Sequence, residues 1–147
     1  MLRITALLLL LCLSCQSKKQ SETAIEKADG TILLVDLEGK SITLEADITI
    51  LNLWATWCKP CIAEMPSLAE MQSQLPDNFK LLLASDEPLE RQLRLIEKQD
   101  ETLDFVQLKS SLEGLGVYAL PTTLIINQEG AILEPMVGAR AWNTAEQ

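Results

Sequence analysis

Four cysteines are the residues of this chain best able to carry chemistry, and they stand at positions 12, 15, 58 and 61. The 147 residues include no histidine. The chain therefore cannot hold a Ser-His-Asp triad, a Cys-His nucleophile pair or a histidine-ligated metal site. The C-x-x-C spacing of Cys58 and Cys61 favours thiol–disulfide chemistry instead.

The elements around this pair make the prediction more specific. A near-continuous apolar run over residues 48–54 predicts a buried strand before the cysteines. Apolar residues at helical spacing follow the pair and predict a helix: Ile62, Met65, Leu68 or Ala69, and Leu75. Unpaired N–H groups at a helix start, together with Lys59, would lower the pKa of the Cys58 thiol. We therefore expect Cys58 to be exposed and to attack, and Cys61, one turn further on, to be shielded and to resolve.

Two other interpretations of Cys58 and Cys61 are a structural disulfide and a zinc site. A loop closed by cysteines three positions apart is too small to stabilise a fold much. Zinc would need two further ligands, and only carboxylates remain to supply them. The same spacing recurs at Cys12 and Cys15, where it lies inside an apolar leader and is interpreted as coincidence.

The other segments predict one mixed α/β domain over residues 31–147. Strands are expected at residues 31–36, 41–44, 79–84, 105–108, 122–127 and 131–133. Leu89, Leu93 and Ile96 predict a second helix, and residues 111–117 predict a short helix or turn. The charged residues at the start of the second helix, Glu87 among them, are interpreted as a solvated face without function.

The N-terminus predicts export and a lipid anchor. One positive charge and about ten apolar residues indicate a signal peptide over residues 1–14, too short to span a bilayer. A buried core helix is the alternative, although a polar stretch follows directly. Leu13-Ser14-Cys15 resembles a bacterial lipobox, with Cys12 where leucine is usual, so Cys15 is the expected lipidation site. Residues 15–30 would then be a polar, lipid-anchored tether.

The charge balance bears on the partners. The chain has 12 Lys and Arg against 21 Asp and Glu, a formal net charge of −9. Nucleic-acid binding needs clustered cations, so no nucleic-acid partner is expected. We expect no metal and no cofactor, and we expect a monomer.

Two blocks of residues resemble the thioredoxin superfamily. Residues 54–61, Trp-Ala-Thr-Trp-Cys-Lys-Pro-Cys, are followed by Glu-Met-Pro at residues 64–66, and residues 116–123 are similar to the superfamily's cis-proline loop. The chain most resembles the TlpA/ResA-like extracytoplasmic thiol-disulfide oxidoreductases, over residues 33–142. The resemblance implies a three-layer α/β sandwich, with a central mixed sheet flanked by helices and an N-terminal β-hairpin.

The resemblance also implies roles for individual residues. Cys58 matches the attacking cysteine and Cys61 the resolving one. Trp57 matches a tryptophan beside the pair, and Pro121 matches the cis-proline. A substrate segment would pair with the backbone of Leu120 by β-augmentation.

Glu64 falls where this branch carries a glutamate near the active site. Asn52 falls where thioredoxin itself has a buried aspartate that takes a proton from the resolving cysteine. Glu64 is therefore a candidate to replace that aspartate, and a plain surface glutamate on a solvated helix face is the alternative.

The function implied is that of a lipoprotein oxidoreductase on the extracytoplasmic, periplasmic side of a membrane. It would reduce disulfides of partner proteins, for example cytochrome c precursors, and take electrons from a membrane-embedded thiol donor. The Lys-Pro dipeptide between the cysteines does not define the redox potential, so oxidation or isomerisation stays open. A redox-inactive scaffold lipoprotein is the alternative from another class. A copper carrier is a third possibility, weakened by the absence of histidine.

Overall fold

A computed structural model describes residues 31–143, and the predicted signal peptide, Cys15, tether and residues 144–147 lie outside the described residues. The described part contains a single mixed sheet with two α-helices and one 3-10 helix. Its elements are β1 (Leu34–Val35), β2 (Ser41–Ile42), β3 (Ile48–Leu53), α1 (Lys59–Gln72), β4 (Phe79–Ser85), α2 (Leu89–Ile96), β5 (Phe105–Leu108), η1 (Glu113–Leu115), β6 (Thr122–Asn127) and β7 (Ile132–Val137).

The strands lie in the order β2-β1-β5-β4-β3-β6-β7. β4 is parallel to β3 and β5, whereas the neighbours β3–β6, β6–β7, β1–β5 and β1–β2 are antiparallel. Strands that are covered on both faces are near-continuously apolar. In β3, Leu51 and Leu53 on one face are fully buried and Ile50 on the other is nearly so, and Thr49 and Asn52 are buried polar exceptions.

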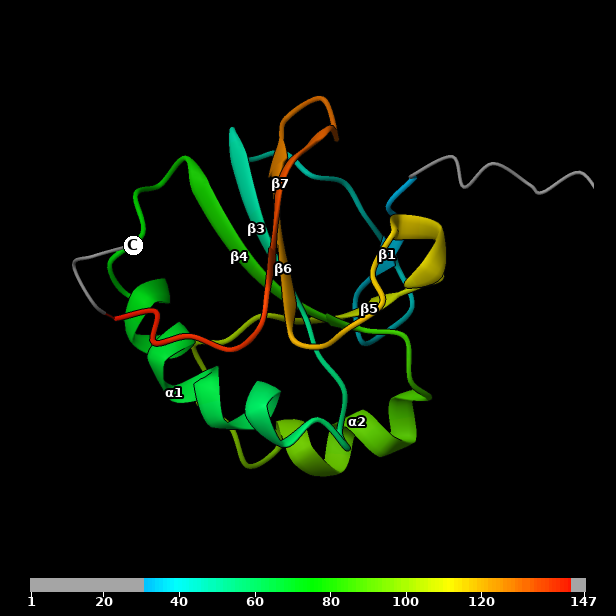
Figure 1. Ribbon diagram of the computed structural model, residues 1–147, viewed down its shortest axis with the longest axis vertical. Coiled ribbons are helices and arrows are strands. Elements are labelled where there is room, and N and C mark those ends of the chain that lie inside the picture. The colour runs from blue at the N-terminus through cyan, green and yellow to red at the C-terminus, as the bar shows by residue number, and fades with distance from the viewer. Residues whose placement is uncertain (1–30, 144–147) are drawn as a thin grey trace, which may run out of the picture.

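Both α-helices cover the same face of the sheet (Figure 1). The connections β3-α1-β4 and β4-α2-β5 each move one strand further in the same direction. Because such crossovers are right-handed, their helices must lie on one side. The core on that side contains both cysteines, Trp54 and Leu68, with Leu95 and Ile96 of α2 packed against it.

The opposite face has a second core, which includes Leu51, Leu82 and Leu124. Within residues 31–143 this face is covered by η1 and by irregular segments, with Leu112 and Leu115 packed on it. The predicted α/β fold with a mixed sheet and an N-terminal hairpin is confirmed. On this second face, the helical part of the outer layer described in residues 31–143 is the short 3-10 helix η1.

Three strands differ by two residues or more from the sequence prediction, and one of them, β2, ends at Ile42 instead of residue 44. β1 is only two residues long, because the Asp36 carboxylate accepts hydrogen bonds from the N–H groups of Glu38 and Lys40 and so begins the turn. β7 extends to Val137 through Pro135. Proline is tolerated there because β7 is an edge strand.

Candidate active site

The two cysteines lie at the start of α1, directly after the loop that leaves β3. Cys58 is the N-cap, and its sulfur accepts a hydrogen bond from the backbone N–H of Cys61 at 3.3 Å. Pro60 occupies the first turn, where its missing N–H needs no partner. Cys58 and Cys61 form a disulfide. The predicted strand–C-x-x-C–helix arrangement is therefore present.

The prediction of an exposed Cys58 is wrong for this oxidised form. Cys58 is 3% exposed and Cys61 is fully buried. The sulfur of Cys58 turns toward the helix to reach Cys61, and both residues belong to the core that contains Trp54 and Ala55. Trp57, one position earlier, is the exposed neighbour, with 69% of its surface accessible.

The second sequence block also comes to this site. The peptide bond between Leu120 and Pro121 is cis. Leu120 packs against the core that contains both cysteines, and within residues 31–143 its backbone makes no hydrogen bond. Pro121 itself is buried, and its carbonyl accepts a hydrogen bond from the Gly138 N–H at 2.9 Å. The structure thus packs Leu120 against the core to which the redox pair belongs, with its backbone unbonded among residues 31–143.

Glu64, three positions after Cys61 on α1, is buried, with 4% of its surface exposed. Its Oε1 accepts a hydrogen bond from Asn52 Nδ2 at 2.8 Å. Its Oε2 accepts one from the Arg140 backbone N–H at 3.1 Å and one from Trp142 Nε1 at 3.2 Å. The interpretation of Glu64 as a residue on a solvated helix face is therefore wrong.

Comparison with known proteins places this geometry in a family. The model of the AhpC/TSA family matches residues 23–134. The chain belongs to the AhpC/TSA family. Thiol-disulfide oxidoreductase ResA of Bacillus cereus strain ZK / E33L is 31% identical over 122 residues, which cover 78% of this chain and 70% of ResA. Thioredoxin-like protein YneN of Bacillus subtilis strain 168 is 32% identical over 119 residues, with coverages of 78% and 66%.

Solved structures show the same thioredoxin-like fold. StoA from Bacillus subtilis superposes with a TM-score of 0.63 at 22% identity, covering 78% of this chain and 93% of StoA. The exposed lipoprotein thioredoxin Etrx1 from Streptococcus pneumoniae strain TIGR4 gives a TM-score of 0.65 at 22% identity, with coverages of 75% and 91%. With its Cys58–Cys61 pair, this AhpC/TSA-family chain is a thiol-disulfide oxidoreductase.

Trp142 is one residue of the site that sequence reasoning missed. After β7, the AhpC/TSA-family chain crosses α1, where the Trp142 backbone N–H donates to Ser67 Oγ at 3.2 Å. The indole is only 9% exposed, and the guanidinium carbon of Arg140 lies 5.4 Å from the centre of its ring. A lone tryptophan in an otherwise polar terminal segment was the available signal.

Glu87 is the second missed residue, and its assignment to a solvated face is wrong. Its carboxylate accepts a hydrogen bond from the Thr56 backbone N–H at 2.5 Å and one from Thr56 Oγ1 at 3.0 Å. Only 9% of the Glu87 side chain is exposed. In the sequence, Glu87 and Arg91 have the i, i+4 spacing of a surface ion pair, and Glu87 Oε1 does lie 4.0 Å from Arg91 Nη1. That spacing suggested a solvent-exposed glutamate and did not indicate the hydrogen bonds to Thr56.

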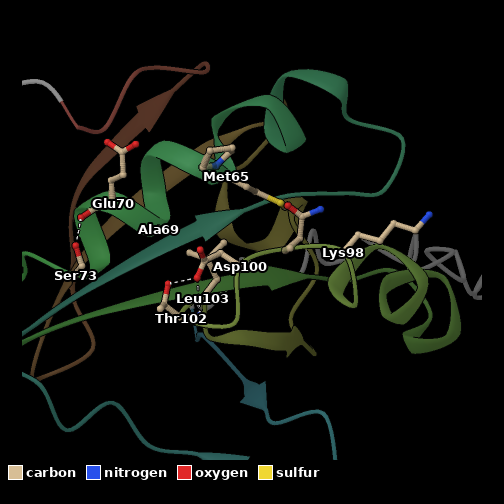
Figure 2. Close-up of a pocket in the computed structure, with 10 residues that line it drawn as sticks. Met65, Ala69, Glu70, Ser73, Lys98, Asp100, Thr102 and Leu103 are labelled. Carbon is tan, nitrogen blue, oxygen red and sulfur yellow. Dashed lines mark hydrogen bonds between the residues drawn. The ribbon is translucent and has the colours of Figure 1, made fainter.

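A hollow of about 610 Å³ lies beside the site (Figure 2). It is bounded by the later turns of α1, including Met65 and Glu70, and by the segment that follows α2, including Lys98 and Asp100. Neither cysteine lines it. Among residues 31–143 there is no group of three potential metal ligands from His, Cys, Asp and Glu.

Proposed function

We propose that this chain is a membrane-tethered, extracytoplasmic oxidoreductase that reduces disulfides of partner proteins, with cytochrome c precursors as an example. The observation that carries the proposal is the Cys58–Cys61 disulfide at the N-terminus of α1, in the core against which Leu120 packs. In the reduced form, the Cys58 thiolate attacks a partner disulfide and releases one partner thiol. Cys61 then attacks the mixed disulfide, which releases the second thiol and leaves Cys58 and Cys61 oxidised. A membrane-embedded thiol donor returns the two electrons.

Three residues are proposed to receive the partner. Trp57 offers an exposed aromatic face beside Cys58. The backbone of Leu120 is available to pair with an extended partner segment, and Pro121 holds that backbone in place. Protein disulfides in extended segments are therefore the proposed substrate class.

The reduction potential of the Cys58–Cys61 couple tests the direction of transfer. A reductant of protein disulfides should have a potential more negative than the about −180 mV of protein disulfide isomerase. Equilibration with glutathione buffers of known ratio, followed by alkylation and mass measurement, gives this value. A potential near the about −120 mV of a strong oxidant would assign the chain to disulfide formation instead.

The membrane tether is proposed from the sequence, with Cys15 as the lipidated first residue of the mature chain. No helix within residues 31–143 is long and apolar enough to cross a bilayer. A lipid group at Cys15 would hold the domain at the surface through the segment 15–30.

Substitution of Cys15 tests the tether. Wild-type protein should enter the detergent phase of a partition assay, and the Cys15→Ser variant should enter the aqueous phase, because the thiol that carries the lipid is gone. Cys12→Ser is the matched control and should partition as the wild type does. Wild-type protein in the aqueous phase, with another first residue, would overturn the anchor.

Glu64 is proposed as the group that exchanges a proton with Cys61. The two residues are three positions apart on α1, a spacing that places side chains on one face of a helix, and both are buried. Asn52, hydrogen-bonded to Glu64, carries an amide and cannot serve as the base.

A further inference from the structure

The loop from Trp54 to Cys58 is held at defined points. The Trp54 backbone N–H donates to the carbonyl of Ala84 at 3.0 Å, and the Cys58 N–H donates to the carbonyl of Ala55 at 3.0 Å. Between these two points, the backbone N–H and the hydroxyl of Thr56 both donate hydrogen bonds to the carboxylate of Glu87. Hydrogen bonds to an ionised acceptor are among the strongest in proteins. Glu87 therefore holds the centre of the loop that leads into the redox pair.

Glu87 is itself fixed by its surroundings. Its carbonyl accepts a hydrogen bond from Gln92 Nε2 at 2.6 Å, and Gln92 is fully buried in α2. Its N–H donates to Ser85 Oγ at 3.3 Å. The side chain is 9% exposed, and its nearest cation, Arg91, is 4.0 Å away with 68% of its side chain in solvent. An ion pair with such an exposed partner leaves most of the carboxylate charge uncompensated.

We propose that Glu87 is a positioning residue of the redox site. Through its hydrogen bonds to Thr56, Glu87 fixes the loop before Cys58, and its carboxylate places a negative charge beside that loop. This inference rests on thiol–disulfide exchange at Cys58, as proposed above. The Glu87 carboxylate is hydrogen-bonded to Thr56, two residues before Cys58, and its negative charge repels the thiolate that forms on reduction. The positive end of α1 and Lys59 stabilise the Cys58 thiolate, and the Glu87 charge opposes this effect. Glu87 therefore keeps the reduction potential of the Cys58–Cys61 couple more negative than it would be without that charge.

Two substitutions at Glu87 separate charge from geometry. Glu87→Gln removes the charge, while its amide oxygen can still accept from the Thr56 N–H and its NH₂ can donate to Thr56 Oγ1. Glu87→Ala removes the charge and both hydrogen bonds. Glu90→Gln is the matched control, because Glu90 lies on α2 three residues later and is exposed.

The first measurement is the equilibrium of the full-length protein with glutathione. In this reaction two glutathione thiols become one glutathione disulfide, while the Cys58–Cys61 disulfide takes up two electrons and two protons. Glu87→Gln should raise the equilibrium constant about two- to tenfold in favour of the dithiol, because it removes one negative charge from the loop that leads to Cys58. A tenfold change corresponds to about 30 mV. Glu90→Gln should leave the constant unchanged.

The second measurement is the reduction of insulin disulfides under steady-state conditions. Glu87→Ala should lower kcat/KM by about tenfold or more, because the loop that presents Cys58 is no longer held. Glu87→Gln should retain most of the wild-type value. Circular dichroism and thermal unfolding of each variant verify that it is folded.

The inference is overturned if Glu87→Gln shifts the glutathione equilibrium no more than Glu90→Gln does. It is also overturned if a folded Glu87→Ala variant reduces insulin as the wild type does. Failure of the proposed function looks different: the wild type itself would not reduce insulin, or Cys58→Ala would do so equally well.

Discussion

A Cys61→Ser variant expressed in the host of origin will accumulate partner proteins that are covalently bound to Cys58. Attack by Cys58 leaves the partner joined through a mixed disulfide, and Cys61 is the thiol placed to break it. The two sulfurs are already bonded at the start of α1, so little motion separates them from the reacting geometry. Effective molarities for well-oriented intramolecular reactions reach about 10⁵ M or more. Removal of Cys61 therefore slows release by orders of magnitude.

Gel electrophoresis without reductant, with free thiols blocked by alkylation, displays these adducts. Dithiothreitol should release the partners for identification by mass spectrometry. The double variant Cys58→Ser, Cys61→Ser should carry none, and Cys58→Ser alone should carry few, because Cys61 is fully buried. Adducts of Cys61→Ser no more abundant than those of the double variant would argue against catalysis through Cys58 and would favour the scaffold alternative.

The redox pair and its setting could be predicted from the sequence because the signals are local. The apolar run before Cys58 predicts a strand, and the helical spacing of apolar residues after Cys61 predicts a helix. The two cysteines lie where this helix begins, after the strand. The place of Pro121 was implied by resemblance, since nothing in its spacing from Cys61 indicates a cis bond. Most strands were likewise marked by apolar runs. Their ends differed, for example where Asp36 begins a turn after β1 and where β7 continues through Pro135 to Val137.

The acidic residues of the site show what local patterns miss. Glu64 and Glu87 each stand at a helical spacing typical of an exposed face, yet both accept hydrogen bonds from distant segments. Their partners Asn52 and Thr56 belong to β3 and its following loop, and Arg140 follows β7. Burial of a carboxylate depends on such donors, which only the tertiary structure brings together. For the same reason, the burial of Cys58 could not be derived from its place at a helix start.

The Glu64→Gln variant should exchange disulfides about 10²-fold more slowly near neutral pH, at little cost in folding stability. A positioned acid–base group typically contributes about 10²- to 10⁴-fold to a proton-transfer step. In the proposed reaction, Glu64 takes the proton that Cys61 must lose before it attacks the mixed disulfide. The amide of the glutamine variant cannot accept this proton. The rate of the variant therefore follows thiol deprotonation alone and rises only toward alkaline pH.

The small stability cost follows from Asn52. Its Oδ1 has no hydrogen-bond partner among the described residues, and its Nδ2 contacts Glu64 Oε1 and Thr123 Oγ1. Rotation of the Asn52 amide by half a turn presents Oδ1 to the new amide N–H and to the Thr123 hydroxyl, which can donate. The rotated amide then has two hydrogen bonds and one unpartnered end, Nδ2 in place of Oδ1. In Glu64→Ala, no rotation of Asn52 can replace the lost acceptor. The Arg140 N–H and the Trp142 indole N–H are left without a partner, which lowers the free energy of unfolding by about 1–3 kcal/mol each.

Stopped-flow measurement of mixed-disulfide resolution between about pH 5 and pH 9 separates these effects, because the range spans the ordinary cysteine pKa of about 8.5. Glu70→Gln is the matched control, since Glu70 is an exposed glutamate on the same helix, and its profile should match that of the wild type. Chemical denaturation should show Glu64→Gln close to wild type and Glu64→Ala clearly less stable. If Glu64→Gln has the wild-type pH profile while Glu64→Ala is destabilised, Glu64 serves only to join α1 to β3 and to the segment after β7, and the proton of Cys61 leaves by another route.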